Sequence, residues 1–396
     1  MKNYRCKSVG IIGSGIQAIC IGYQLIKKGI PVTLFDKNDP LSINYKPASY
    51  GNAGHFSPYA VLQLNRPDIL YDVPKMLSSS NGPLALKWNY VPKMLKWFYH
   101  YLRNCNEKSM LHTAKYMHQI LNLSNDAYEE IFQEIDTSDL VEKKGIIYIW
   151  TNQNLKSRKL EIKIRDSLGI KQKLLSKKQI LDLEPNLNPV FDAGVIYENA
   201  MHARDPHGIL KQIFKLFLKK GGKFVQTEIK SLEQKNSNET IIKSDNDNFK
   251  FEKTVVATGA FSKQFSDQLG ENIPLDTERG YHVHFKNKDN LISRPVIFLD
   301  RGFGMTPMNQ GLRAVGTVEL GGLKNPPSKK RIEYVINCAK ELLPQLGNHE
   351  DEWLGFRPTL PDFLPILGPS LKNKNIIYAF GHQHLGWTLG AITGKI

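Results

Sequence analysis

Three small residues near the amino terminus, spaced as Gly13-x-Gly15-x-x-Ala18, are the residues whose spacing points most directly to chemistry. An apolar run precedes them and a helical pattern follows, which predicts a strand, a tight turn and a helix. In such a unit the first glycine permits the turn and the second lets the backbone approach a pyrophosphate. The third small residue lets helix and strand pack closely. The helix start at Ile16 and Gln17 would then offer free N–H groups and a positive dipole end to the phosphates.

An acidic residue, Asp36, closes the second predicted strand at 31–35 and is followed by Lys37. An acid about 20 residues after the glycines can accept both hydroxyls of an adenosine ribose, and it argues against a 2′-phosphate. The pattern therefore predicts a dinucleotide cofactor, either NAD or FAD. The alternative is an ordinary βαβ turn with incidental glycines, but the strand, the helix and the acid together favour the cofactor site.

Length and charge limit the classes of protein to consider. A chain of 396 residues is long for a single core, so two domains are expected. The net charge of +15 would suit an anionic partner, either nucleic acid or a membrane surface. The lysines are scattered and form no long basic block, which favours a solvated surface and predicts no nucleic-acid partner.

Metal and disulfide chemistry find little support in the sequence. The cysteines stand far apart without a CxxC motif: Cys6, Cys20, Cys105 and Cys338. Two histidine pairs, 282/284 and 382/384, lack a third ligand at suitable spacing, so we predict no metal site. No secretory signal and no run of 18 apolar residues is present, which predicts a cytoplasmic enzyme.

The chain as a whole reads as an α/β protein whose dinucleotide domain is interrupted in sequence. A second strand running into a glycine turn, Ala257-Thr258-Gly259, lies far from the first unit. We therefore expect a Rossmann-like cofactor domain split in sequence, and an inserted α+β substrate domain with a mixed or antiparallel sheet. The predicted cofactor domain comprises 1–85, 195–275 and 350–396, and the predicted substrate domain comprises 86–194 and 276–349.

Periodicity and turn signals predict the remaining elements. Residues 83–103 combine apolar, aromatic and basic side chains and predict an amphipathic helix, which suits a buried face better than a membrane anchor. Asp205 and Pro206 are typical of a helix start. Further helices are predicted at 106–135, 154–182, 208–220 and 328–343, strands at 145–150, 194–197, 223–227 and 280–285, a hairpin at 240–251, and a helix start at 385–387.

Six short motifs, taken together, resemble the FAD-dependent amine and amino-acid oxidoreductases that include D-amino-acid oxidase, glycine oxidase and sarcosine oxidase. The likeness is strongest to the small-subunit type of bacterial D-amino-acid dehydrogenase. Their order and spacing are more specific than any one of them. The motifs are Gly13-Ser14-Gly15-Ile16-Gln17-Ala18, Ser49-Tyr50-Gly51-Asn52-Ala53-Gly54, Ala257-Thr258-Gly259-Ala260, Arg279-Gly280-Tyr281, Gly355-Phe356-Arg357-Pro358 and Gly381-His382 through Gly386-Trp387-Thr388.

The resemblance implies an extended FAD whose flavin ring lies between the two domains. It implies that the loop Asn52-Ala53-Gly54 lines the isoalloxazine and that the backbone of Val225 contacts adenine. Gly386-Trp387-Thr388 resembles the turn at the pyrimidine end of the flavin. A helix starting there would aim its positive end at N1 and C2=O, where negative charge accumulates when the flavin takes a hydride.

For the substrate, the resemblance implies that Arg357 binds a carboxylate. A guanidinium can hold a carboxylate bidentately and so fix the α-carbon over flavin N5. Tyr281 and His55 are further candidates for the pocket. His55 departs from the glutamine expected in close relatives, and the stretch at 303–305 departs from the tyrosines that some relatives carry.

The predicted function is oxidation of a small, D-configured amino or imino acid at its Cα–N bond. Hydride passes to flavin N5, and the imino acid product hydrolyses to an oxo acid and ammonia. The predicted electron acceptor is a quinone or another carrier, with oxygen as the alternative, and peripheral contact with the inner face of the cell membrane is left open. The other candidates are a NAD-dependent dehydrogenase and a non-catalytic basic scaffold that keeps FAD. Relatives carry the final helix beyond Ile396, a pattern expected of a shortened chain.

Overall fold

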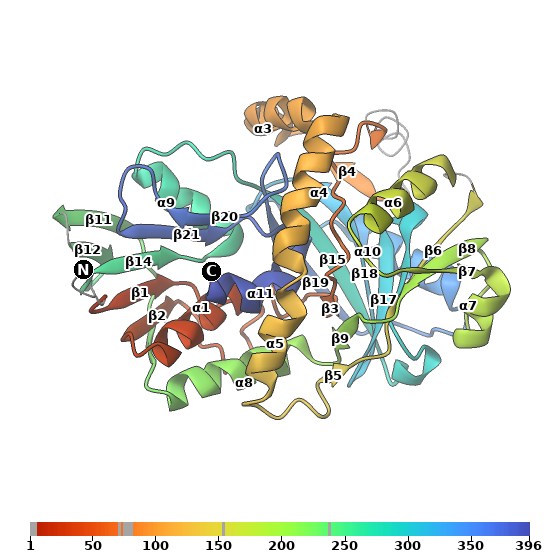
Figure 1. Cartoon of the computed structure of the whole chain (residues 1–396), viewed down its shortest axis with the longest axis horizontal. Coiled ribbons are helices and arrows are strands. Elements are labelled where there is room, and N and C mark those ends of the chain that lie inside the picture. Colours follow the sequence, from red (N-terminus) through yellow and green to blue (C-terminus); the bar gives the residue numbers. More distant parts are fainter. Residues whose placement is uncertain (1–5, 70–72, 74–81, 153–154, 237–238) are drawn as a thin grey trace.

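Two sheets dominate the computed structural model, which describes residues 6–69, 73, 82–152, 155–236 and 239–396 (Figure 1). The first has six strands in the order β10-β2-β1-β14-β21-β20, and all neighbours are parallel except β21 and β20. Strands β2 and β10 lie on one side of β1 and the later strand β14 lies on the other, so the strand order reverses between β1 and β14, where doubly wound sheets bind ligands. The strands are β1 Val9–Ile12, β2 Val32–Asp36, β10 Lys223–Gln226, β14 Lys253–Val256, β20 Ile366–Pro369 and β21 Ile376–Phe380.

Three helices pack beside this sheet: α1 (Ile16–Lys27), α8 (Pro206–Lys219) and α11 (Gly386–Lys395). Helix α1 ends because Gly29 adopts a positive φ of 72°. Helix α8 begins at the predicted cap, where the Asp205 carboxylate accepts the Gly208 N–H at 2.9 Å.

Glycines bring α11 close to α1. A Cβ on Gly390 would lie 2.7 Å from Ile16 Cγ1, and one on Gly394 would lie 2.6 Å from the Cys20 carbonyl oxygen. Any larger residue at these positions would push the helices apart. The small residues therefore allow α11 to pack closely against the first half of α1.

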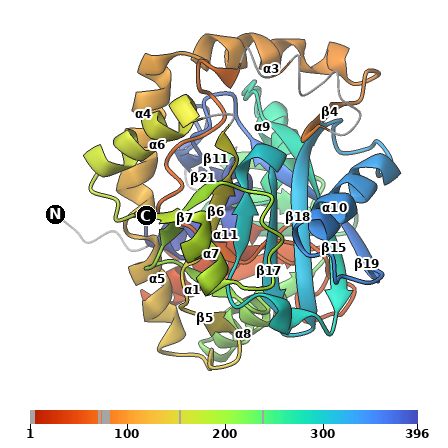
Figure 2. The ribbon, with the colours of Figure 1, turned by 90° about the vertical axis from the view of Figure 1, so that its right-hand side faces the viewer.

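The second sheet is mixed and mainly antiparallel, in the order β19-β15-β18-β17-β16-β6-β8-β7, with β4 beside β18. Its core includes Val283, Phe285 and Leu312, packed against Val335 and Leu342 of α10 (Lys329–Leu342). Figure 2 shows α10 beside β18. The strands are β4 Leu84–Leu86, β6 Ile146–Trp150, β7 Lys173–Ser176, β8 Ala193–Tyr197, β15 Asp276–Lys286, β16 Val296–Phe298, β17 Phe303–Met308, β18 Gly311–Leu320 and β19 Asp351–Thr359.

Smaller elements complete the fold. One three-stranded sheet contains β11, β12 and β13, and the other joins β3, β9 and β5. The strands are β3 His55–Phe56, β5 Val141–Glu142, β9 Met201–Ala203, β11 Ser231–Asn236, β12 Glu239–Lys243 and β13 Asn248–Phe251. The helices are α3 Val91–Asn104, α4 Glu107–Leu121, α5 Ser124–Phe132, α6 Leu155–Ser167, α7 Lys177–Leu183 and α9 Lys263–Gln268.

Three predicted helices differ from the observed elements. Residues 84–86 form β4 because they pair with β18, so helix α3 starts only at Val91. The predicted helix at 106–135 is two helices, α4 and α5. The predicted helix at 154–182 is split by β7, which pairs with β8, and residue 154 lies outside the described residues. In each strand, pairing with a distant segment overrides local helical periodicity.

Sheet membership also bears on the proposed division into domains. Strands β4, β8 and β19 all belong to the second sheet, although the predicted cofactor domain included residues 84–85, 195–197 and 351–359. We therefore move those boundaries in the proposed division to follow the sheets. The predicted hairpin and the helices at 208–220 and 328–343 are confirmed within a residue or two.

Candidate active site

The turn between β1 and α1 has the geometry of a pyrophosphate cradle. Gly13 adopts φ 109°, and a Cβ there would lie 2.6 Å from the Ala257 carbonyl oxygen, so only glycine fits. A Cβ on Gly15 would meet nothing nearer than Ser49 Oγ at 3.6 Å, which leaves room for a ligand beside the backbone. No side chain caps the start of α1, although the Ile16 N–H donates to Ser49 Oγ at 3.1 Å. The cradle fits a phosphate group.

Asp36 lies at the same edge of the first sheet, where β2 ends. Its Oδ2 accepts the backbone N–H and the hydroxyl of Ser14 at 3.1 and 2.8 Å, and Oδ1 accepts the Asn38 N–H at 3.1 Å. Burial raises its pKa, and these hydrogen bonds oppose that shift. Val225 pairs with Phe35 on the neighbouring strand, so its backbone lies at the edge where an adenine would follow the ribose. Lys37 is exposed.

The loop at 50–54 is fixed to the second sheet. Arg313 Nη1 donates to the carbonyl oxygens of Tyr50 and Asn52 at 3.1 and 2.8 Å, and His282 Nδ1 lies 3.0 Å from the Gly51 carbonyl oxygen. Burial lowers the pKa of Arg313 to about 10. No sequence motif marks Arg313, so its role in holding this loop could not be predicted from the sequence.

Gly54 holds the end of that loop. Its φ is 76°, and a Cβ would lie 2.6 Å from the Ala203 carbonyl oxygen. The Gly54 N–H is accepted by Asn52 Oδ1 at 2.8 Å, and its carbonyl accepts the Ala203 N–H at 2.7 Å. With both ends bonded, Asn52, Ala53 and Gly54 form a rigid wall beside the second sheet.

The start of α11 adjoins both the cradle and the loop. Gln17 Nε2 donates to the Gly386 carbonyl oxygen at 2.5 Å, and Tyr128 donates to the Trp387 carbonyl oxygen at 2.6 Å. Thr388 Oγ1 accepts the Ser57 N–H at 3.0 Å and donates to the His55 carbonyl at 3.1 Å. Leu385, the N-cap residue of α11, has no side chain that could cap the helix, so no cap side chain from this residue would compete with a ligand there.

Arg357 extends from β19 across the inner face of the second sheet. Its Nη1 donates to the Thr317 carbonyl oxygen at 3.0 Å, and a Cβ on Gly280 would lie 2.2 Å from Nη2. The guanidinium therefore lies flat over a glycine. Burial lowers its pKa, and the nearby carboxylate of Glu278 opposes that shift.

His384 lies beside this arginine, just before α11. Burial lowers its pKa to about 4, with a smaller contribution from the Arg357 charge. His384 is an exposed residue, so its side chain is accessible from solvent.

The other two predicted pocket residues are His55 on β3 and Tyr281 on β15. His55 Nε2 is 2.7 Å from Thr306 Oγ1 on β17, and burial lowers its pKa to about 3, so the ring is neutral near pH 7. Tyr281 is buried on the α10 side of the sheet, where its hydroxyl donates to Glu319 at 2.6 Å. Because β15 is buried on both faces, no polar alternation in the sequence could assign Tyr281 to a face. We do not carry Tyr281 into the proposed site.

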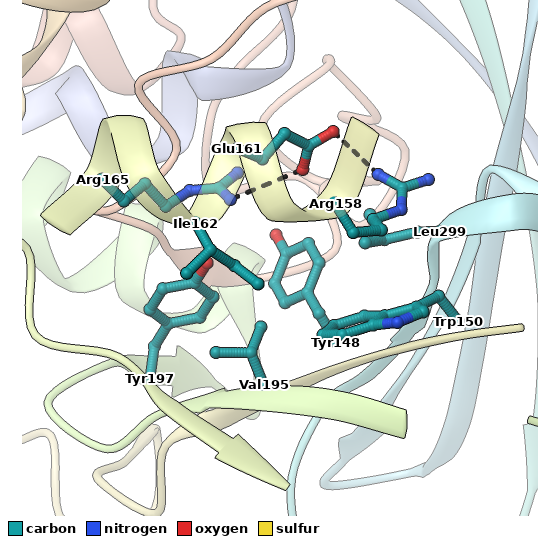
Figure 3. Close-up of a pocket in the computed structure, with 9 residues that line it drawn as sticks. All are labelled: Tyr148, Trp150, Arg158, Glu161, Ile162, Arg165, Val195, Tyr197 and Leu299. Carbon is teal, nitrogen blue, oxygen red and sulfur yellow. Dashed lines mark hydrogen bonds and ion pairs between the residues drawn. The ribbon is translucent and has the colours of Figure 1, made fainter. Parts of the chain in front are cut away.

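A separate hollow lies between α6 and the strands β6 and β8 (Figure 3). Glu161 accepts hydrogen bonds there from Arg158 at 2.8 Å and Arg165 at 3.5 Å, and it also pairs with Arg66. Tyr148 and Tyr197 line the floor. Glu161 and the other acids that pair with these arginines balance much of the positive charge, so the cluster serves to tie α6 to the sheet.

The described residues contain no group of three histidine, cysteine or acidic side chains that could share a metal ion. None of their helices has the length and apolar character needed to cross a bilayer.

A mostly parallel sheet with a phosphate cradle, together with a second sheet that carries a half-buried arginine, is typical of a dinucleotide-dependent oxidoreductase. Residues 8–396 match the family described as FAD dependent oxidoreductase, so the chain belongs to that family and uses FAD. The predicted family, fold class and cofactor are confirmed, and FAD is selected over NAD. The uncapped start of α1, the space beside Gly15 and the acid at Asp36 fit this cofactor.

Relatives cover almost the whole chain. A D-amino-acid oxidase of Bradyrhizobium diazoefficiens is 31% identical, over 98% of this chain and 94% of its own. A D-amino acid dehydrogenase of Vibrio atlanticus is 28% identical over the same shares. Among solved structures, glycine oxidase from Geobacillus kaustophilus superimposes with a TM-score of 0.73 at 19% identity, over 98% of this chain and 92% of that one.

Proposed function

We propose that this enzyme dehydrogenates a small D-amino acid at its Cα–N bond, giving an imino acid that hydrolyses to an oxo acid and ammonia. The observation that carries the proposal is Arg357, a half-buried guanidinium with no carboxylate within ion-pair distance among the described residues. A cation partly withdrawn from water is costly unless a ligand pairs with it. The names of the two relatives, an oxidase and a dehydrogenase of D-amino acids, support an amino acid as that ligand.

FAD would be held by residues from six segments. When bound it would supply the hydride-accepting chemistry, and the chain would supply binding and orientation. The predicted contacts remain proposals: Gly13, Gly15, Ile16, Gln17, Ala18, Asp36, Lys37, Asn52, Ala53, Gly54, Val225, Ala257, Thr258, Gly259, Gly386, Trp387 and Thr388. The open start of α11 would stabilise negative charge at the pyrimidine end of the ring.

The side chains around the substrate then have distinct tasks. Arg357 would fix the carboxylate, and Gly280 would keep its guanidinium flat on the sheet. His55 and His384 have pKa values of about 3 and 4, so both are neutral at pH 7 and add no competing positive charge. This arrangement orients the α-carbon without requiring a strong protein base.

For the electron acceptor, we propose a quinone or another carrier at an anionic membrane surface, with oxygen as the second candidate. Helix α3 packs against the rest of the protein through its buried residues Met94 and Trp97. The Trp97 Nε1–H donates to the Thr359 carbonyl oxygen at 3.1 Å. The other side of α3 is apolar and basic, a combination that binds anionic bilayers. The exposed residues are Trp88, Leu95, Tyr99 and Leu102, with Lys93, Lys96 and Arg103 on the same segment. Oxygen stays a candidate because one relative is named an oxidase.

A substrate screen tests the proposal. Purified holoenzyme is mixed anaerobically with single D- and L-amino acids, and bleaching of the flavin band is recorded. We expect bleaching with small D-amino acids and release of an oxo acid and ammonia. If none of the amino acids bleaches the flavin band, the proposed function is refuted.

The acceptor is tested separately. Turnover is measured with oxygen, with a soluble dye, and with quinone in anionic vesicles. Lys93→Gln with Lys96→Gln should weaken vesicle binding by roughly 25-fold, at about 1 kcal/mol per lysine, and leave dye-coupled turnover unchanged. Peroxide produced as fast as substrate disappears, without gain from quinone, would identify an oxidase.

A further inference from the structure

Glu278 lies directly opposite Arg357 in the second sheet. Strands β15 and β19 are antiparallel, and Glu278 pairs with Arg357 in register. Directly paired residues project to the same face, with Cβ atoms about 4.5–5.5 Å apart. Gly280, two residues along on the same face, leaves room for the Arg357 guanidinium, since a Cβ there would lie 2.2 Å from Nη2. A carboxylate and a guanidinium thus lie side by side on the inner face.

The two charges lie close together without forming an ion pair. Glu278 is 5% exposed, and its carboxylate makes no hydrogen bond or salt bridge within the part of the chain that the structure describes. Burial raises its pKa, and Arg357 is the one charge that opposes the shift. Buried carboxylates are nearly always hydrogen-bonded, since an unpaired one costs several kcal/mol of desolvation. An unpaired buried carboxylate therefore indicates a missing partner.

A zwitterion supplies that partner better than a simple ion does. A plain carboxylate would pair with Arg357 but would leave Glu278 unpaired and repelled by a like charge. A simple amine would pair with Glu278 but would leave Arg357 unpaired and repelled by a like charge. An α-amino acid carries both charges on adjacent atoms, so it can satisfy both side chains at once.

We propose that Glu278 is a specificity-determining residue that binds the substrate ammonium group while Arg357 binds its carboxylate. The inference rests on the proposed function and deepens it, because it selects α-amino acids over hydroxy acids and simple carboxylates. Nothing in the sequence marked Glu278 for this role.

The test compares two ligands that the enzyme cannot dehydrogenate at a Cα–N bond. 2-Methylalanine is a zwitterion without a Cα–H, and isobutyrate is the matched carboxylate in which hydrogen replaces the ammonium group. Their dissociation constants are measured for the holoenzyme by perturbation of the flavin spectrum. Wild type should bind 2-methylalanine more tightly than isobutyrate.

Glu278→Gln should weaken 2-methylalanine by about 10- to 100-fold, the range for a charged hydrogen bond, and should leave isobutyrate unchanged or tighter. Glu352→Gln removes an exposed carboxylate from the same strand pair and should change neither constant. If Glu278→Gln fails to fold with FAD, Glu278→Asp keeps the charge and should still weaken the zwitterion severalfold relative to isobutyrate.

The possible outcomes distinguish a failure of the proposed role of Glu278 from a failure of the proposed function. Equal weakening of both ligands, or a change under about threefold for the zwitterion, would overturn the role of Glu278 while amino-acid oxidation by wild type stands. Wild type that neither binds 2-methylalanine nor oxidises any amino acid would overturn both.

Discussion

Replacing Arg357 with leucine removes the proposed carboxylate ligand and leaves the cofactor domain untouched. The guanidinium lies on β19 of the second sheet, and its one side-chain hydrogen bond among the described residues goes to the Thr317 carbonyl. The variant should therefore fold and retain FAD. Its substrate, however, would bury a carboxylate beside Glu278 with no cation to offset it.

The expected loss follows from that buried charge. Truncating one partner of a desolvated, bidentate charge pair costs about 2–5 kcal/mol. At about 1.4 kcal/mol per factor of ten, kcat/KM should fall by roughly 30- to 3,000-fold. Arg357→Lys should recover only part of this, because a point charge cannot reproduce the fork geometry.

The assay is anaerobic flavin reduction by the best amino acid, with dye-coupled turnover as a second measure. FAD content and the thermal midpoint are recorded for each variant. Arg103→Leu, which removes an arginine from the exposed side of α3, is the matched control and should keep full dye-coupled activity. An amine without a carboxylate should be a poor substrate and should barely respond to Arg357→Leu. A loss of less than about threefold on every amino acid oxidised would refute the carboxylate role.

Three further predictions follow from the geometry. Gly280→Ala places a Cβ 2.2 Å from the neighbouring guanidinium, so kcat/KM should fall about 100-fold with FAD retained; unchanged kinetics would contradict it. Gly13→Ala combines φ 109° with a 2.6 Å contact to a carbonyl oxygen, so purified protein should contain little FAD; a full complement of FAD, measured by absorbance after denaturation, would contradict it. His202 is fully buried and its pKa is lowered to about 3, so the unfolded state binds more protons than the folded state between pH 6.5 and pH 3. The free energy of unfolding should therefore fall as the pH drops through this range. His202→Leu should reduce the slope of that fall by up to about 1.4 kcal/mol per pH unit, measured by urea titration, and an unchanged slope would contradict the prediction.

The cofactor half of the site was predictable because local rules govern it. A left-handed φ at Gly13 and an open helix start at Gly15 each demand a particular residue type, so their spacing is visible in one sequence. The acid at the end of β2 is likewise local, and the strand, turn and helix were found where predicted. The family resemblance added Arg357, which no local rule marks as a ligand.

The substrate half depends on pairing between distant segments, which the sequence alone did not show. Strand β15 is buried on both faces, so its residues lack the alternation that would separate Glu278 from Tyr281. The faces become distinct only once β15 is paired with β18 and β19. The role of Arg313 also depends on contact between distant segments, because it holds a loop about 260 residues away in the chain.

The last helix connects the two halves physically. Helix α11 follows β21 of the cofactor sheet, and its glycines at 386, 390 and 394 lie against Gln17, Ile16 and Cys20 of α1. Its first turn also holds β3 through Thr388, and β3 leads back into the loop fixed by Arg313. The close contact between α1 and α11 thus links the phosphate cradle, the proposed flavin loop and the sheet that carries Arg357. Small residues at these positions are needed because a displacement of about 1 Å between reacting groups can cost about 100-fold in rate.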